Sequence, residues 1–395
     1  DEHINMHNSF SPNTPTLHHS ITPTLPLIPT RVNPLRIHPE ERRSVLDSGW
    51  IFRLDPDDRG IREKWFQDRG NGWDPIQVPG CWQGQGFGSD AQDEVWDFRL
   101  KARIFRATYT GTGWYRKSFS IPDKFIGSRL WLRFGGVHPS ADVWLNNTPV
   151  GSHGLPFVPF GFEITNIVRR GESNHLAIRV HEANREYGFA FSWQGNWSGL
   201  YRAVELVATG AQSLEQVWFN PDAERRLLGV NARVDGLPAQ GSLALEIRVR
   251  EAGRPEIIAE ATHPVSSSAT QFEMPITGPK RWSPDAPNLY EADIRLLAGD
   301  RVLDAQTERI GFVRLATRGR QFLINGEPYY MRGTGDFISC PETGSPDTDR
   351  DRWRRKLKAL RDYGYNYVRC QSYVYGPEYY DAADEVGLLV QSEMG

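Results

Sequence analysis

The chain has 395 residues, and at ~100–200 residues per domain it is expected to form two to four domains. It contains 46 Lys and Arg residues against 49 Asp and Glu residues, and the net charge of −3 argues against a nucleic-acid-binding protein. No apolar run approaches the ~20 residues that span a bilayer, so we expect no membrane-spanning helix. Aromatic residues make up 12% of the chain, which is enough for large cores or for surfaces that stack on a flat ligand.

Cysteine and metal-binding patterns exclude several other classes of protein. Cys81, Cys340 and Cys370 are widely spaced and form no CxxC pair, so neither a disulfide framework nor a zinc site is expected. A phosphate-binding loop, an HExxH zinc site and a GxSxG nucleophile elbow are also missing from the sequence. We therefore expect no cofactor. The sequence does not determine the cellular compartment of the protein.

Residues 1–44 differ in composition from the rest of the chain. They are rich in proline, threonine and histidine and have no apolar periodicity. Because proline stiffens the chain and removes hydrogen-bond donors, we expect an extended leader here rather than a folded domain.

Residues 45–210 predict a sandwich of two antiparallel sheets. Short stretches such as TGWYRKSFSI, RLWLRF and HLAIRV alternate between apolar and polar positions and are rich in aromatic and β-branched residues. Turn residues, including Asn146-Asn147 and Arg170-Gly171, separate them. Ten of the 13 tryptophans lie between Trp50 and Trp197, so we expect this domain to hold most of the stacking capacity.

Residues 211–317 repeat the β pattern with almost no tryptophan. Stretches such as GVNARVD, LALEIRVR and YEADIRLL alternate cleanly. About seven short strands in this segment predict an immunoglobulin-like β-sandwich that acts as a spacer.

The periodicity changes near residue 318. The pair Asn325-Gly326 can adopt the positive φ values of a tight hairpin turn. The segment that follows predicts a helix, because its apolar residues recur every three or four positions. The apolar face of this helix is expected to consist of Trp353, Leu357, Leu360 and Tyr363.

Two helices are expected to alternate with strands in the last segment, residues 318–395. Asp349 and Asp351 suit the first turn of the first helix, and Gly364 suits its end. Pro377 begins the second helix and Gly387 ends it. The resulting order of strand, helix, strand, helix and strand is typical of a parallel sheet.

The last segment is too short for a complete α/β barrel. It contains about 75 residues, whereas a closed eight-stranded barrel needs ~250. A three-stranded parallel piece would leave one edge and one face uncovered. We therefore expect the barrel to be completed by further polypeptide, either of the same chain or of another chain.

Four local patterns occur along the chain in a characteristic order. They are GNWSGLYRAVEL (Gly195–Leu206), RWSPDAPNLY (Arg281–Tyr290), RIGFVR followed by FLINGEPYYMRG, and NYVRCQSYVYGPEYYDAADEVGLLVQSE. Together they resemble glycoside hydrolase family 2, the group of β-galactosidases, β-glucuronidases and β-mannosidases. The resemblance implies a jelly-roll sugar-binding domain, an immunoglobulin-like sandwich and the first three strands of a TIM barrel.

The same resemblance implies a carbohydrate substrate and a retaining reaction. Enzymes of this kind use two carboxylates, one as acid/base and one as nucleophile. In the family both are Glu, at the ends of the fourth and seventh barrel strands, and neither strand is present in this sequence. The chain is thus expected to be the N-terminal part of an exo-acting glycoside hydrolase without its catalytic pair. No cofactor is implied, and a Mg²⁺ or Na⁺ ion is suggested only by analogy.

Three residues of the barrel segment match site positions of the family. Arg369 matches an arginine that lies beside the nucleophile and holds it ionised, although it could also form a structural ion pair. Asp336 falls in the loop that carries polar sugar ligands, or it caps that loop. Glu393 matches an acidic position near the site, or it stabilises the barrel.

Three residues of the jelly-roll segment are further candidates. Glu182 lies on a loop that, in the family, reaches the mouth of the barrel. Trp193 and Trp197 could stack on a sugar face, or they could pack in the core of the sandwich.

The sequence also departs from the family pattern. Ser372 stands where well-known members carry a histidine, and the first-strand loop, Gly335 to Phe337, lacks the family's other histidine. The loss of two imidazole donors should change which sugar fits, so we expect neither plain β-galactosidase nor plain β-glucuronidase activity. Two other functions stay open, a non-catalytic carbohydrate-binding protein with a vestigial barrel and a structural scaffold. A homo-oligomer stays open as well.

Overall fold

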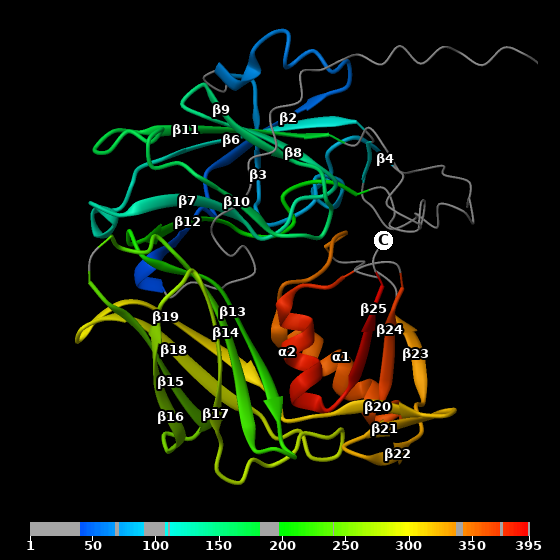
Figure 1. Cartoon of the computed structure of the whole chain (residues 1–395). Helices are drawn as coiled ribbons and strands as arrows, with labels where there is room; N and C mark the ends of the chain where they lie inside the picture. The colour runs from blue at the N-terminus through cyan, green and yellow to red at the C-terminus, as the bar shows by residue number, and fades with distance from the viewer. Residues whose placement is uncertain are drawn as a thin grey trace, which may run out of the picture.

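The protein consists of two β-sandwiches and a smaller α/β unit, which follow one another along the chain (Figure 1). The computed structural model describes residues 40–67, 71–90, 107–109, 111–181, 197–239, 241–336, 343–371 and 374–393. Most of the expected leader and the candidate residues Glu182 and Trp193 lie outside these ranges. The predicted fold class, mostly β followed by α/β, is confirmed.

The first sandwich is built from two antiparallel sheets. Its strands are β1 (Arg43–Val45), β2 (Trp50–Asp55), β3 (Asp74–Ile76), β6 (Thr112–Phe119), β7 (Arg129–Phe134), β8 (Ala141–Leu145), β9 (Thr148–His153), β10 (Phe160–Glu163), β11 (Asn174–His181) and β12 (Val204–Thr209), with a short pair β4 (Ser89–Asp90) and β5 (Ala107–Thr108) beside them. One sheet has the order β1-β12-β7-β10 and the other β3-β2-β6-β11-β8-β9. Short 3₁₀ helices connect some strands, at Glu40–Arg42, Trp65–Gln67, Gln83–Gln85 and Asp123–Phe125.

Tryptophan in this sandwich is buried. Trp50 and Trp82 belong to the main core between the sheets, whereas the rings of Trp114 and Trp144 stack at 5.3 Å in a second cluster that includes Trp65. Burying one such side chain stabilises the fold by up to ~4–6 kcal/mol. Of the two uses left open for the aromatic residues, large cores and stacking surfaces, the described tryptophans of this domain serve the first, since all are at most 8% exposed: Trp50, Trp65, Trp73, Trp82, Trp114, Trp131, Trp144 and Trp197.

The second sandwich has the seven strands that the sequence predicts. They are β13 (Ser213–Asp222), β14 (Leu227–Asp235), β15 (Leu243–Glu251), β16 (Ile257–Val265), β17 (Ala269–Pro275), β18 (Tyr290–Ala298) and β19 (Arg301–Ile310). Their orders are β13-β14-β17 and β16-β15-β18-β19. Along β15, buried and partly exposed positions alternate, so that Leu245 and Ile247 face the core opposite Leu296 and Ile294 of β18. This arrangement is immunoglobulin-like, as predicted.

A small hairpin sheet begins the last part of the chain. It consists of β20 (Leu315–Arg318), β21 (Gln321–Ile324) and β22 (Glu327–Tyr329). The turn between β21 and β22 has φ values of 56° at Asn325 and 91° at Gly326. Because Asn and Gly tolerate this left-handed region best, the predicted hairpin turn forms at these residues.

A three-stranded parallel sheet with two helices follows the hairpin. Its elements are β23 (Gly333–Asp336), α1 (Arg350–Asp362), β24 (Tyr367–Cys370), α2 (Pro377–Val386) and β25 (Leu389–Ser392). The Asp349 side chain accepts hydrogen bonds from the first backbone N–H groups of α1, and α2 ends at Gly387 with φ 73°. The placement of Tyr363 on the apolar face is wrong: α1 ends one residue earlier, and the Tyr363 side chain is 85% exposed.

Direct contacts join the α/β unit to both sandwiches. Arg202 of the first sandwich forms an ion pair with Glu378 of α2, and Arg309 of the second forms one with Glu385. The Trp282 indole N–H donates to the Asp384 carbonyl at 3.0 Å. Separately, none of the helices in the described ranges has the length and apolar character needed to cross a membrane.

Candidate functional site

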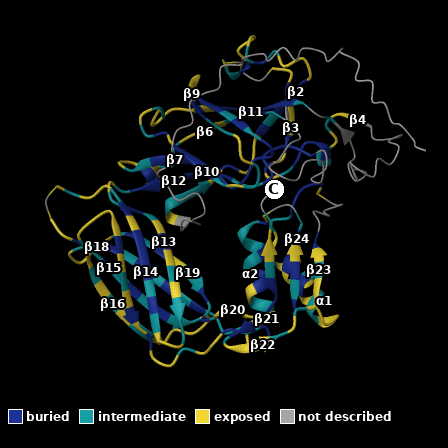
Figure 2. Ribbon diagram, turned by 45° about the vertical axis from the view of Figure 1, so that its right-hand side comes forward, coloured by how far each residue is buried: buried dark blue, intermediate teal, exposed yellow. Residues whose placement is uncertain are grey.

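Strand alternation sorts the residues of the parallel sheet onto two faces. The ladder aligns Gly335 with Arg369 and Gln391 in one row, and Asp336 with Cys370 and Ser392 in the next. Cys370 packs in the cluster that contains Trp353 of α1 and Tyr379 of α2. Because neighbouring residues of a strand point to opposite faces, the row of Asp336 faces the helices, and the row of Arg369 faces the other side. In Figure 2 the strands β23 to β25 carry exposed residues, unlike most of the first sandwich.

Arg369 and Glu393 meet at the carboxyl end of this sheet. The Arg369 Nε group donates to the Glu393 carboxylate, and the two side chains are 48% and 23% exposed. A guanidinium offers five N–H donors, and this contact occupies one of them. Among the described residues, Glu393 is the ion-pair partner of Arg369, so the terminal amino groups stay available to a second carboxylate. The sequence predicted these two residues near a site, and the structure brings them together.

Asp336 does not lie with them. It is the last residue of β23 rather than part of the following loop, and its side chain is 5% exposed. One carboxylate oxygen accepts from Lys356 Nζ at 2.7 Å, and the other accepts from the Tyr379 hydroxyl at 2.8 Å. Both donors come from the helices. The prediction that Asp336 serves as a sugar ligand is therefore corrected to a structural role between sheet and helices.

Cys370 lies in the same row as Asp336, packed against the helices, and its thiol is unreactive as a nucleophile. Burial, together with the nearby Asp336 carboxylate, raises the pKa of its thiol to about 12. Since the thiolate is the reactive species, this cysteine is not a nucleophile at neutral pH. The same environment, with Asp336 beside it, raises the pKa of the Tyr379 hydroxyl, which therefore acts as a hydrogen-bond donor.

Trp197 lies in the core of the first sandwich. It is 1% exposed, and the ring of His138 stacks on it with centroids 4.1 Å apart. Tyr201 packs edge-on at 5.1 Å. The His138 Nδ1 atom lies 2.8 Å from the Trp197 carbonyl, and burial lowers the pKa of this histidine to about 3, so it is neutral. Of the two roles left open for Trp197, the packing of its buried ring against His138 and Tyr201 favours the structural one.

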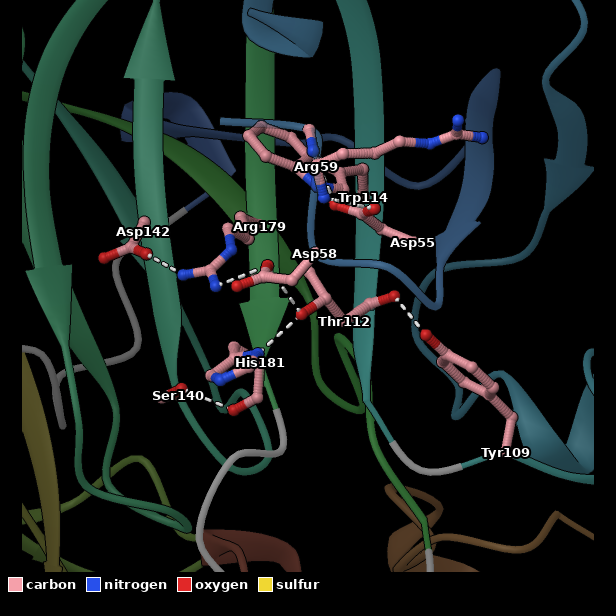
Figure 3. Close-up of polar contacts among 11 residues, drawn as sticks. Asp55, Asp58, Arg59, Tyr109, Thr112, Trp114, Ser140, Asp142, Arg179 and His181 are labelled. Atoms are coloured by element: carbon pink, nitrogen blue, oxygen red, sulfur yellow. Dashed lines mark hydrogen bonds and ion pairs between the residues drawn. The ribbon is translucent and has the colours of Figure 1, made fainter. Parts of the chain in front are cut away.

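A polar network that sequence reasoning missed occupies one end of the first sandwich (Figure 3). The buried Arg179 donates to Asp58 at 2.8 Å and to Asp142 at 3.0 Å. The Thr112 hydroxyl donates to Asp58 at 3.1 Å, so its oxygen accepts from His181 Nδ1, 2.5 Å away. Burial lowers the pKa of His181, and the Arg179 charge lowers it further. A neutral imidazole with a fixed tautomer results.

This network fixes the last residue of β11. Ser140 Oγ also donates to the His181 carbonyl at 2.7 Å, so both the ring and the backbone of His181 are held. The next residue is Glu182, which lies outside the described ranges. A signal was present in the sequence, since Arg179 and His181 alternate on one strand face and a cluster of acidic residues precedes them at Asp55 to Asp58.

The residues at the sheet edge do not fit a metal ion. In the described part of the chain, no group of three or more His, Cys, Asp or Glu side chains could hold one. Glu393, the acidic residue at this edge, is paired with Arg369. We therefore derive no chemical step through an ion.

Three family models match consecutive parts of the chain. They are the sugar binding domain of glycosyl hydrolases family 2 at residues 43–210, the model described simply as glycosyl hydrolases family 2 at 212–312, and the TIM barrel domain of the same family at 315–395. This chain belongs to glycoside hydrolase family 2. The carbohydrate-hydrolase class that the sequence predicted is thereby confirmed at the level of the family.

The relatives of this chain include proteins named β-galactosidase and proteins named β-glucuronidase. A β-galactosidase of Thermoanaerobacter pseudethanolicus is 28% identical over 307 residues, which are 72% of this chain and 40% of that protein. A β-glucuronidase of Paenibacillus borealis is 25% identical over 370 residues, 87% of this chain and 57% of that protein. The chain thus spans about half the length of these relatives or less.

Solved structures share the fold. The Ruminococcus gnavus β-glucuronidase superposes with a TM-score of 0.75 at 23% identity, covering 91% of this chain and 60% of that chain. A family 2 member from Bacteroides cellulosilyticus superposes with a TM-score of 0.74 at 25% identity, covering 90% and 46%. These similarities extend over both sandwiches and the α/β unit.

Proposed function

We propose that this chain is the N-terminal part of a retaining, exo-acting glycoside hydrolase that removes terminal sugars from oligo- or polysaccharides. The two catalytic carboxylates would come from barrel strands that this sequence does not contain. The observation that carries the proposal is the position of Arg369, on the face of the sheet away from the helices and at the carboxyl ends of its strands. Catalytic groups of α/β barrels gather at that end.

The chemistry of Arg369 suits a role beside a nucleophilic carboxylate. A nucleophile must be ionised, and a guanidinium within ~4–6 Å lowers the pKa of a carboxyl group by ~1–3 units. Glu393 holds the Nε side of Arg369 and so fixes the plane of the guanidinium. The remaining amino groups can then bind a second carboxylate in two-pronged fashion. Arg369 would hold the nucleophile ionised and oriented, and Glu393 would position Arg369.

The described carboxylates at this sheet do not form a catalytic pair themselves. Retaining hydrolysis needs two carboxyl groups ~5–5.5 Å apart on either side of the glycosidic bond. Asp336 faces the helices, where Lys356 and Tyr379 occupy both of its oxygens. Glu393 is engaged by Arg369. This geometry supports an assignment of both catalytic groups to other strands.

The sugar is proposed to differ from that of plain β-galactosidases and β-glucuronidases. Ser372 and Gly335 to Phe337 replace positions where well-known members carry histidine. A pocket that loses hydrogen-bond donors to a sugar hydroxyl discriminates differently among sugars.

Covalent trapping of the nucleophile tests this proposal. The product of the complete natural reading frame would be incubated with 2-deoxy-2-fluoro-β-glycosides of galactose, glucuronic acid, mannose and glucose, and labelled peptides would be located by mass spectrometry. We expect one sugar to label a single glutamate outside the present sequence. A label on Glu393 or Asp336, or a reading frame that ends at Gly395, would contradict the proposal. Glycan binding without labelling or turnover would favour a non-catalytic carbohydrate-binding protein instead.

A further inference from the structure

A cavity lies on the first sandwich, away from the end that carries the polar network of His181. It has a volume of about 820 Å³, within the ~300–1,000 Å³ range of ligand pockets. Ser118 of β6 and His175 of β11 line it. In the ladder Ser118 pairs with His175, whereas Thr112 pairs with His181 at the other end. Six residues along each strand separate the two ends, or ~20 Å at ~3.3 Å per residue.

The lining of this cavity is basic. Arg116, Lys117 and Arg169 contribute three positive charges, and none of the described residues that line the cavity is an Asp or Glu. The chain as a whole carries a net charge of −3, so the excess of positive charge at this cavity is opposite in sign to the net charge of the protein. A concave surface of one sign concentrates field lines and attracts ligands of the opposite charge.

The three cations are held in different ways. Arg116 is 7% exposed and donates to the Trp65 carbonyl at 2.8 Å, which fixes a buried charge beside the cavity. Lys117 donates to the Ser48 carbonyl, and burial lowers its pKa although Asp47 opposes the shift. Arg169 is exposed, and its backbone N–H donates to Asn174 at 2.8 Å. No ion pair joins the Arg169 side chain to a described carboxylate, so its charge is available to a ligand.

Neutral polar groups share the cavity with these cations. The side chains of Ser48, Ser118 and Asn147 line it together with His175, whose Nδ1 atom lies 2.9 Å from the Ser118 hydroxyl. Hydroxyl and amide groups both donate and accept, so they match the hydroxyl groups of a sugar. The mixture of fixed cations with such groups therefore suits a saccharide that carries an acidic substituent better than a bare anion.

We propose that this cavity binds an anionic saccharide through its carboxylate or sulfate group. Arg169 and Lys117 bind the acidic group, and Asn147 and the serine hydroxyls bind ring hydroxyls. The site is separate from the sheet edge at Arg369, so the protein would hold an acidic polysaccharide at one place while hydrolysis takes place at another. This inference goes beyond the proposed function, and its test does not depend on turnover.

Isothermal titration of the product of the complete reading frame tests the inference with four probes. The probes are trigalacturonate, the neutral trisaccharide galactotriose, a sulfated galacto-oligosaccharide and sodium sulfate. We expect at least one acidic saccharide to bind at least about tenfold more tightly than galactotriose and than sulfate. Whether trigalacturonate or the sulfated oligosaccharide binds more tightly identifies the acidic group.

A matched pair of charge reversals separates a specific site from general attraction. Arg169→Glu should weaken binding of the acidic saccharide at least about tenfold, since it removes one charge-assisted contact and adds a repulsive one. Arg301→Glu reverses the charge of another exposed arginine, on β19 and outside the cavity, and should change affinity less than about twofold. Arg369→Ala should leave this affinity unchanged, which distinguishes the site from the sheet edge.

Several results would overturn the inference. Equal binding of galactotriose would remove the requirement for an acidic group, and equal binding of sulfate would reduce the site to one for simple anions. If Arg169→Glu and Arg301→Glu reduce the affinity for the acidic saccharide by the same factor, binding reflects general electrostatic attraction rather than a specific site. Absence of binding by all four probes at millimolar concentration would eliminate the site.

Discussion

Replacing Asp336 by alanine should destabilise the α/β unit without weakening saccharide binding. The side chain is 5% exposed and joins β23 to both helices, through Lys356 of α1 and Tyr379 of α2. This carboxylate lies on the face of the sheet opposite the one that carries Arg369. A change at Asp336 therefore reports on stability alone.

The size of the effect follows from the two donors. The Tyr379 side chain is 0% exposed, and a buried hydroxyl without its acceptor costs ~1–3 kcal/mol. Lys356 is 39% exposed, so its ammonium regains hydration and the loss of the ion pair adds ~0–1 kcal/mol. Together the two contributions give an expected loss of about 1–4 kcal/mol. Asp336→Asn should cost less, because its amide oxygen can still accept from Tyr379.

Hydrogen exchange followed by mass spectrometry measures this loss locally. At 1.36 kcal/mol per tenfold change, amides of β23 and α2 should exchange ~5- to ~900-fold faster in Asp336→Ala. Asp362→Asn is the matched control, since it breaks another Asp–Lys pair, with Lys358, whose side chains are 62% and 66% exposed. It should cost less than ~0.5 kcal/mol. Equal exchange in the two variants, or lost saccharide binding at unchanged exchange, would refute the structural role of Asp336.

Three further predictions concern the first sandwich. Arg202→Met removes the contacts of 2.5 and 2.7 Å to Glu378 and leaves the Glu378 carboxylate partly buried without its partner. This change should destabilise α2 by ~1–3 kcal/mol. An unchanged rate of proteolysis within α2 would contradict the role of this ion pair. Burial holds the pKa of His138 at about 3 in the folded protein, whereas the pKa of histidine in the unfolded chain is ~6.5. The neutral, buried His138 therefore makes its full contribution to the unfolding free energy above pH ~6.5, and this contribution is lost as the pH falls towards ~3. His138→Gln should therefore reduce the fall in unfolding free energy between pH 7 and 5 by up to ~2 kcal/mol, and urea titrations that show the same fall in both proteins would disprove the assignment. Trp197→Phe should lower the unfolding free energy by ~1–3 kcal/mol with unchanged saccharide affinity, whereas the reverse pattern would place Trp197 in a binding site.

Local sequence signals predicted most of the secondary structure. The Asp349 cap, Pro377 at the start of α2 and Gly387 at its end each depend on the conformation of one or two residues, so they can be seen without tertiary information. Alternation over nine residues likewise predicted strands such as β15. The family patterns predicted the order of the three parts.

The face of a side chain and its burial could not be predicted in the same way. Asp336 was placed just after its strand, and an error of one residue moves a side chain to the opposite face of a sheet. Trp197 has the same sequence appearance in a core as on a binding surface, because only tertiary packing by His138 and Tyr201 distinguishes the two. The Arg179 network joins residues up to 121 positions apart, beyond any local pattern.

Hydrolysis of a β-glycoside by the product of the complete reading frame, followed by proton NMR of the released sugar, tests the proposed function most directly. We expect the first sugar released to be the β-anomer, because two successive displacements retain the configuration. Arg369→Lys should lower kcat by ~10²-fold or more, since lysine cannot bind a carboxylate in two-pronged fashion. Release of the α-anomer first, or hydrolysis by Arg369→Lys at the rate of the natural enzyme, would contradict the proposal.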